Sequence, residues 1–107
     1  MNGSASSRDL LEDARAAAAR QDFARADALY EQLLAQGAVA ARIESLRYLA
    51  MRAFRAGAAD RAVDYSRQVT ELEPGASVHW LNLGVACRGA ADLPAARAAF
   101  AEALRRD

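Results

Sequence analysis

The sequence has no lysine, one histidine and one cysteine. The shortage of histidine and cysteine limits the catalytic and metal-binding sites that the chain can form. A single cysteine, Cys87, excludes an internal disulfide and any cysteine-built metal site, and a buried thiol acting as a small hydrophobe is expected. With only His79, the chain has no histidine pair for zinc and no spacing that suggests a Ser-His-Asp or Cys-His set. We therefore predict a chain that is not an enzyme and has no catalytic residue, metal site or cofactor, with His79 a structural or surface side chain.

Long apolar runs and an excess of one charge are also missing. Fourteen basic and fourteen acidic residues give a net charge of zero, which argues against nucleic acid or a membrane surface as partner. No run of 18 apolar residues occurs, and residues 1–7 are small and polar without an apolar signal region. A cytoplasmic location is the default expectation, although a leader outside this sequence would leave no trace in it.

Alanine dominates what is present. It outnumbers Leu, Ile, Val and Phe combined, so the core must depend on close helix approach and not on bulky side chains. Every basic residue other than His79 is arginine. Together with the alanine content, this bias is typical of a high-GC genome and suggests a bacterial source.

Helix start and stop signals divide the chain into six segments of about four turns each. Asp22 and Asp92 are expected N-caps, Ser6 or Ser7 and Ser77 are further candidates, and Gly37, Gly57 and Pro74-Gly75 end segments. The predicted helices cover about residues 7–20, 22–37, 41–56, 59–72, 77–89 and 92–107. Because no strand-like alternation occurs and the connections are short, we predict an all-α fold of three antiparallel helix-turn-helix hairpins.

A period of about 34 residues links the last two pairs of helices. The later copy contains Trp80, Leu83, Gly84, Cys87, Ala96, Phe100 and Ala103. The earlier copy contains Leu46, Leu49, Ala50, Ala53, Ala62, Ser66 and Val69, and Pro74 closes it. These residues resemble the tetratricopeptide repeat. The resemblance implies a right-handed α-solenoid over residues 7–107, with repeats at about 7–42, 43–76 and 77–107 after a disordered N-terminal segment, residues 1–6.

The first repeat is degenerate and out of step. When Ala26 is aligned with Ala62 and Ala96, the first interval is longer than the second by two positions, which places the extra residues in the stretch 37–42. Asp13 also falls where Leu49 and Leu83 lie in the other copies. A divergent end repeat is common because its outer face has no neighbouring repeat to pack on.

The resemblance also implies a concave groove lined by the first helix of each hairpin. The predicted peptide-binding residues are Arg15, Arg47, Tyr48, Met51, Phe54, Arg55, Asn82, Val85 and Arg88, with Leu81 on the same face. Arginine forks suit carboxylates, and aromatic and methionine side chains suit an apolar anchor beside them. In relatives, an asparagine at the position of Asn82 commonly binds a peptide backbone. As an alternative, Phe54 and Met51 fill helix interfaces and the arginines pair with nearby acids, such as Arg47 with Glu44.

These observations predict a protein-protein interaction module or scaffold that binds a protein or peptide with acidic groups. Two alternatives stay open: an N-terminal accessory module of a larger bacterial enzyme, such as a hydroxylase or group transferase, and a small secretion chaperone. The last helix ends at Arg105-Arg106-Asp107 without the polar outer face of a finished array. We expect either further chain beyond Asp107 or a homodimer through this helix, where Ala95, Ala99 and Leu104 remain partly exposed.

Overall fold

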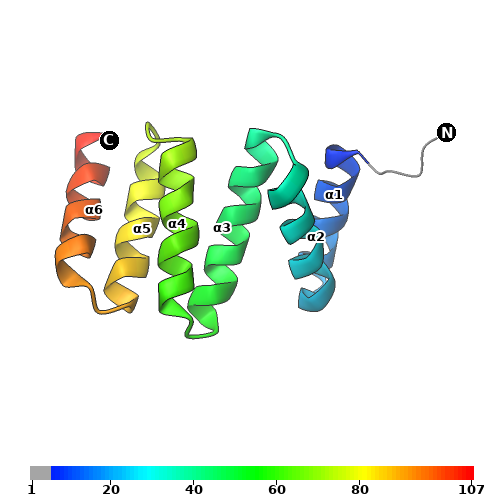
Figure 1. Cartoon of the computed structure of the whole chain (residues 1–107), viewed down its shortest axis with the longest axis horizontal. Helices are drawn as coiled ribbons and strands as arrows, with labels where there is room; N and C mark the ends of the chain where they lie inside the picture. Colours follow the sequence, from blue (N-terminus) through cyan, green and yellow to red (C-terminus); the bar gives the residue numbers. More distant parts are fainter. Residues whose placement is uncertain (1–5) are drawn as a thin grey trace. The chain divides into compact units, whose positions relative to one another are not determined.

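The computed structural model describes residues 6–107, which form six α-helices and no β-strand (Figure 1). The helices are α1 (Ser7–Ala19), α2 (Phe23–Gln36), α3 (Val39–Arg55), α4 (Ala59–Leu72), α5 (Ser77–Gly89) and α6 (Leu93–Arg105). The predicted all-α class and the number of helices are confirmed. Of the segment expected to be disordered, residues 1–5 lie outside the described residues and Ser6 is the N-cap of α1.

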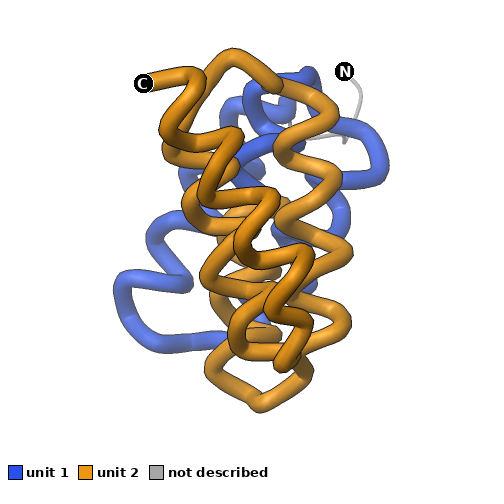
Figure 2. Tube along the Cα trace, turned by 90° about the vertical axis from the view of Figure 1, so that its left-hand side faces the viewer, with its two compact units in different colours: residues 1–45 blue, residues 46–107 orange. Residues whose placement is uncertain are grey.

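The chain divides into two compact units, residues 1–45 and residues 46–107, which Figure 2 colours separately. In the first unit, α1 packs against α2. The buried side chains of this pair are small or medium-sized apart from one tyrosine: Leu10, Ala14, Ala17, Ala26, Tyr30 and Leu33. Their spacing of three or four residues places each set on one helical face.

In the second unit, α5 packs against both α4 and α6 (Figure 1). One buried cluster consists only of alanines, Ala53, Ala62 and Ala86, which come from α3, α4 and α5. A second cluster joins α5 to α6 through Leu83, Cys87, Ala96 and Ala99. Because alanine has no side chain beyond Cβ, helices that meet through it can approach closely. The prediction of an alanine-based core therefore holds in this unit.

Gly84 of α5 and Phe100 of α6 lie in close contact. A Cβ atom added at Gly84 would lie 2.5 Å from Cε1 of the Phe100 ring, which is shorter than any normal carbon contact. The ring therefore rests directly on the backbone of α5. Only glycine fits this position without moving the ring, which gives a packing reason for the glycine in the repeated pattern.

Three turns, which join α1 to α2, α3 to α4 and α5 to α6, share one backbone geometry. Each contains a residue of positive φ: Gln21 at 61°, Gly57 at 80° and Ala91 at 61°. In each turn the next amide donates to a carbonyl five residues back at 2.9 Å, from Asp22 to Ala17, from Ala58 to Ala53 and from Asp92 to Cys87. This pattern is that of a Schellman motif. The interval from Gln21 to Gly57 exceeds the interval from Gly57 to Ala91 by two positions. The same difference separates the intervals between the aligned residues Ala26, Ala62 and Ala96.

The residue after the positive φ begins the next helix, and its side chain decides whether that helix is capped. Asp22 accepts from the amide of Arg25 at 3.4 Å, and Asp92 accepts from that of Ala95 at 3.2 Å. Ser6 caps α1 in the same way through the amide of Asp9. Ala58, at the start of α4, has no side-chain acceptor to offer. The middle turn therefore lacks a stabilising cap that the other two possess.

One predicted cap is wrong. Ser77 is the first residue of α5, and Ala76 occupies the N-cap position without a side-chain hydrogen bond. The amide of His79 donates instead to the carbonyl of Ala76 at 3.1 Å. Two side-chain contacts also attach this helix start to the preceding turn: Trp80 Nε1 donates to the carbonyl of Pro74 at 2.8 Å, and His79 pairs with Glu73. These longer contacts fix the start of α5, and a local serine cap is not needed.

Replacement of Ala91 by glycine removes the strain of an alanine in the left-handed conformation, and it also makes the unfolded chain more flexible. Because the first effect is the larger, we expect the free energy of unfolding to rise by about 0.5–1 kcal/mol. A second variant, Ala58→Asp, is expected to raise the free energy of unfolding by about 1 kcal/mol, because aspartate supplies the side-chain acceptor that the N-cap of α4 lacks. Urea unfolding followed by circular dichroism measures both. The matched control is Ala90→Gly, one residue earlier at φ −86°, which should be destabilising. Equal losses for Ala90→Gly and Ala91→Gly would contradict the proposed strain.

Candidate functional site

Arg15, the one predicted groove residue of the first unit, is held by a carboxylate of that unit. Its Nε and Nη2 atoms donate to the two oxygens of Glu44 at 2.7 and 2.6 Å. The hydroxyl of Tyr30 donates to the same carboxylate at 3.4 Å. The hydrogen bond to Glu44 raises the pKa of Arg15, and burial followed by the charge of Glu44 raises that of Tyr30. Arg15 therefore already has a bidentate partner, which the sequence did not reveal.

The remaining eight predicted residues belong to the second unit, and one of them does not reach the surface. Tyr48 is only 8% exposed and Met51 is half-buried, whereas Arg47, Phe54 and Arg55 of the same helix are exposed. The buried face of α3 includes Leu46, Tyr48 and Leu49, so it is wider than the repeated pattern indicated. Tyr48 thus belongs to the core, and the expectation that it lines an accessible surface is wrong for the structure as it stands.

Large apolar side chains lie exposed on α3 and α5. Phe54 is 45% exposed, Val78 45% and Leu81 48%. Val85 is half-buried, and Asn82 is exposed between Leu81 and Val85. We call the surface made by these residues with Met51 the α3–α5 face: Met51, Phe54, Val78, Leu81, Asn82 and Val85. Val78 was not among the predicted residues, although its spacing of three and four residues from Leu81 and Asn82 could have indicated it.

The ring of Phe54 joins the two helices of this face. A Cβ atom added at Gly89 would lie 2.7 Å from Cε1 of Phe54, so the ring lies against the backbone at the end of α5. Ala53 of α3 and Ala86 of α5 also belong to one buried cluster. Because α3 and α5 run in the same direction (Figure 1), Met51 on α3 and Val85 on α5 both lie one turn before this contact. The exposed apolar residues therefore come from two adjoining helices.

The charged side chains that residues 46–55 and α5 contribute to the α3–α5 face are all positive. Residues 46–55 and α5 contain no aspartate or glutamate, and their four arginines are Arg47, Arg52, Arg55 and Arg88. Among residues 6–107, Arg47 and Arg55 form no ion pair with a carboxylate. Arg88 lies over the ring of Phe100, with its guanidinium carbon 5.9 Å from the ring centroid. Arg88 therefore makes a cation–π contact at the edge of the face next to α6.

His79 is buried and has a structural role at the start of α5. Its Nε2 atom lies 2.6 Å from Oε1 of Glu73, and its Nδ1 atom is buried without a hydrogen-bond partner among the described residues. The sequence had predicted a structural or surface histidine, and its burial identifies the structural role. Residues 6–107 contain no group of three or more His, Cys, Asp or Glu side chains placed to hold a metal ion.

Cys87 is buried in the cluster that joins α5 to α6, as predicted for a thiol that packs as a small hydrophobe. Burial raises its pKa above the ordinary thiol value. Because the nucleophile is the thiolate, a buried thiol of raised pKa is unreactive near neutral pH. The chain's single thiol therefore offers no nucleophile at a surface.

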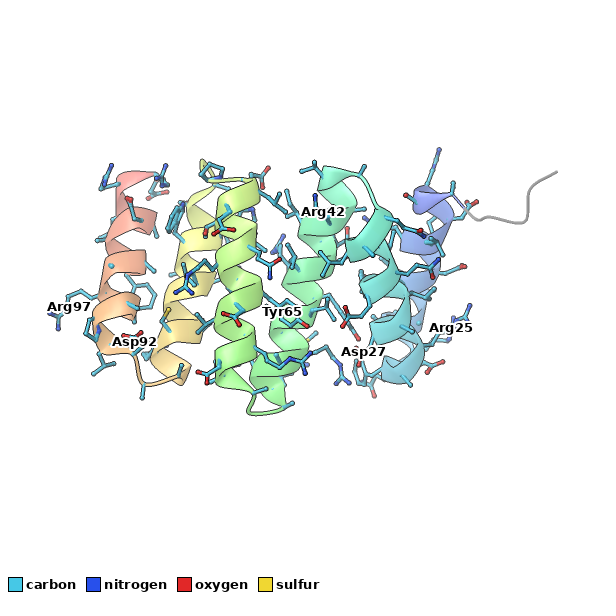
Figure 3. The ribbon with its side chains drawn as sticks, viewed as in Figure 1. Arg25, Asp27, Arg42, Tyr65, Asp92 and Arg97 are labelled. Carbon is cyan, nitrogen blue, oxygen red and sulfur yellow. The ribbon has the colours of Figure 1, made fainter. Side chains whose placement is uncertain are left out.

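The outer side of α6 exposes only some of the apolar residues that were expected there. Leu93 and Leu104 are exposed, Ala95 is half-buried, and Ala99 is buried in the cluster that joins α5 to α6. Arg97 points away from the helix (Figure 3). Ala99 is therefore not part of an exposed dimerisation face, and a homodimer through α6 stays a prediction based on Leu104.

Comparisons of the sequence with protein-family models and with curated proteins identify no family for this chain. No protein-family model matches the sequence, and the curated proteins include no significant match. Within residues 6–107, every helix is too short or too polar to cross a membrane.

The buried thiol makes stability depend on pH in the alkaline range. Because the pKa of Cys87 is raised by folding, its contribution is fully present below the ordinary thiol pKa of about 8.5 and is lost as pH rises through the raised value. We expect the free energy of unfolding to fall above about pH 8.5, and to fall less steeply in Cys87→Ala. Urea unfolding at several pH values measures this. Parallel profiles for the two proteins would contradict the assignment.

Proposed function

We propose that this chain is a protein-protein interaction module that binds a peptide or protein segment on the α3–α5 face. The observation that carries the proposal is the exposure of Phe54, Val78 and Leu81 beside Arg47 and Arg55, which form no ion pair with a carboxylate of residues 6–107. Contiguous exposed apolar groups with a polar rim are typical of binding surfaces. In a chain whose core is built largely from alanine, the placement of these large side chains outside the core needs a further reason, and ligand binding supplies one.

The residues suggest how such a ligand is held. Phe54 and Leu81 offer an apolar anchor site, and the guanidinium groups of Arg47, Arg55 and Arg88 offer bidentate hydrogen bonds to carboxylates. Asn82, exposed between Leu81 and Val85, can both donate and accept one hydrogen bond to a ligand. We therefore propose a partner with acidic groups next to apolar side chains.

We also infer that the six helices are three tetratricopeptide-like hairpins in a right-handed solenoid. The recurrence of one turn geometry at Gln21, Gly57 and Ala91 supports this inference, because these residues follow the same longer and then shorter interval as the repeated alanines. The packing of Phe100 on Gly84 supports it as well, since both residues belong to the repeated pattern. A non-enzymatic role accords with the burial of Cys87 and with the pairing of His79 to Glu73.

Arg55 and Arg88 provide the test of the proposed function. Random linear peptides displayed on phage are selected against the full chain, and the affinity of a selected peptide is measured at low and at physiological salt. Arg55→Ala/Arg88→Ala is expected to weaken binding about tenfold and to reduce its salt dependence, because two charged contacts are lost. Urea unfolding of the double variant checks that the loss does not come from instability.

The matched control is Arg67→Ala/Arg97→Ala, which removes two exposed arginines from α4 and α6 and changes the net charge equally. This control should bind like the wild type. If both double variants weaken binding to the same extent, bulk charge is responsible and the α3–α5 face is the wrong assignment. If no peptide is selected at all, the proposed function itself is wrong.

A further inference from the structure

We propose that the partner docks on the α3–α5 face as an amphipathic α-helix with acidic residues beside its apolar stripe, and not as an extended peptide. This inference rests on the proposed function and names the class of partner. Three features of the face carry it: the hydrogen-bonding groups it offers, the spacing of its apolar side chains, and its charge.

The first feature is a shortage of hydrogen-bond acceptors. An extended peptide presents an unpaired N–H and C=O group at every residue, and each one buried without a hydrogen-bond partner weakens binding by its cost of desolvation. Arginine has donors only, and residues 46–55 and α5 contain no carboxylate. On the face itself, the side-chain oxygen of Asn82 is the acceptor that is exposed among apolar neighbours. One amide cannot satisfy a row of peptide N–H groups.

A helical partner removes this cost. In an α-helix the backbone N–H and C=O groups are paired within the segment, except at its ends. Such a partner needs only apolar contact along the face and a few polar contacts at its rim. A surface rich in apolar groups and poor in acceptors therefore favours a partner that brings its own backbone hydrogen bonds.

The second feature is the spacing of the apolar side chains. Val78, Leu81 and Val85 follow one another at intervals of three and four residues, which aligns them along one side of α5. From residue 78 to Gly89, where the ring of Phe54 lies, the stripe extends about 16 Å, or three helical turns. A row of this kind packs into the groove beside the matching row of another helix. The partner helix should accordingly carry apolar residues at intervals of three and four over about three turns.

The third feature is charge. Arg47 and Arg55 come from α3 and Arg88 from the side of α5 nearest α6, so positive groups lie beside the apolar stripe. Residues 46–55 and α5 contain no acidic residue, so glutamate or aspartate on the flanks of a partner helix meets no like charge from these two segments. Pairing of these acids with the arginines would also fix which side of the partner helix faces the stripe.

Two phage-displayed peptide libraries test the inference against the full chain. The first has an Ala/Glu helical scaffold with apolar residues randomised at i, i+3, i+4 and i+7. The second has the same randomised residues in alternation, with prolines that exclude a helix. We expect enrichment from the helical library, and about tenfold or more weaker binding when a proline is placed in the middle of a selected peptide. Circular dichroism of the bound peptide should show helix.

Leu81→Asp localises the binding, and Leu104→Asp is its control because it places the same charge at an exposed leucine of α6. Leu81→Asp is expected to weaken binding of the selected helical peptide about tenfold or more, and Leu104→Asp is expected to leave the affinity unchanged. If only the extended library is enriched, the helical partner is wrong while the proposed function stands. If neither library is enriched, or if Leu81→Asp has no effect, both the helical partner and the α3–α5 face are wrong.

Discussion

The close approach of helices through small side chains is the constraint on which the second unit depends. Phe100 rests on the backbone of Gly84, and Phe54 rests on the backbone of Gly89 in the same manner. Between these contacts, α3, α4 and α5 meet through the alanines Ala53, Ala62 and Ala86. Interiors of proteins are close-packed, so an interface built from alanine and glycine has little room for additional methylene groups. Two large side chains, Phe100 and Phe54, are accordingly placed on glycine, and others lie exposed outside the core.

This constraint explains the chemical character of the α3–α5 face. Leu83 fills the space between α5 and α6, whereas Leu81, two residues earlier, turns to the exposed side of the same helix. The exposed side collects Val78 and Leu81 from α5 and Phe54 from α3, and no acidic residue interrupts them. An exposed apolar face lowers the solubility of a protein, and this supports the proposal that a partner covers the α3–α5 face.

Local signals made much of the fold predictable from the sequence. Asp22 and Asp92 cap helices as expected, because an N-cap needs only its own side chain and an amide three residues away. The unequal repeat intervals are visible both in the aligned alanines and in the three turns, since both reflect the same repeated backbone. Helix ends were located within about two residues because Gly57 and the Pro74-Gly75 pair stop helices directly.

Contacts between distant residues were not predictable in the same way. The pairing of Arg15 with Glu44 joins side chains 29 positions apart, and no spacing rule on one helix indicates it. Tyr48 and Ala99 were expected on exposed faces and are buried, because periodicity identifies the centre of a helical face but not how far its flanks are covered. Ser77 was expected to cap α5, but the contacts of His79 and Trp80 with the preceding turn fix that helix start. Packing therefore corrects the expected exposure of individual residues, and the binding role of the candidate site stays a prediction.

The central claim is that the apolar side chains of the α3–α5 face are available to a ligand and are not needed for folding. The free energies of unfolding of Leu81→Ala and Leu83→Ala test this most directly, because the two leucines belong to one helix and differ in burial. We expect a loss of about 2–5 kcal/mol for Leu83→Ala and of less than about 1 kcal/mol for Leu81→Ala. Equal losses for the two variants would show that Leu81 supports the fold, and would contradict the account.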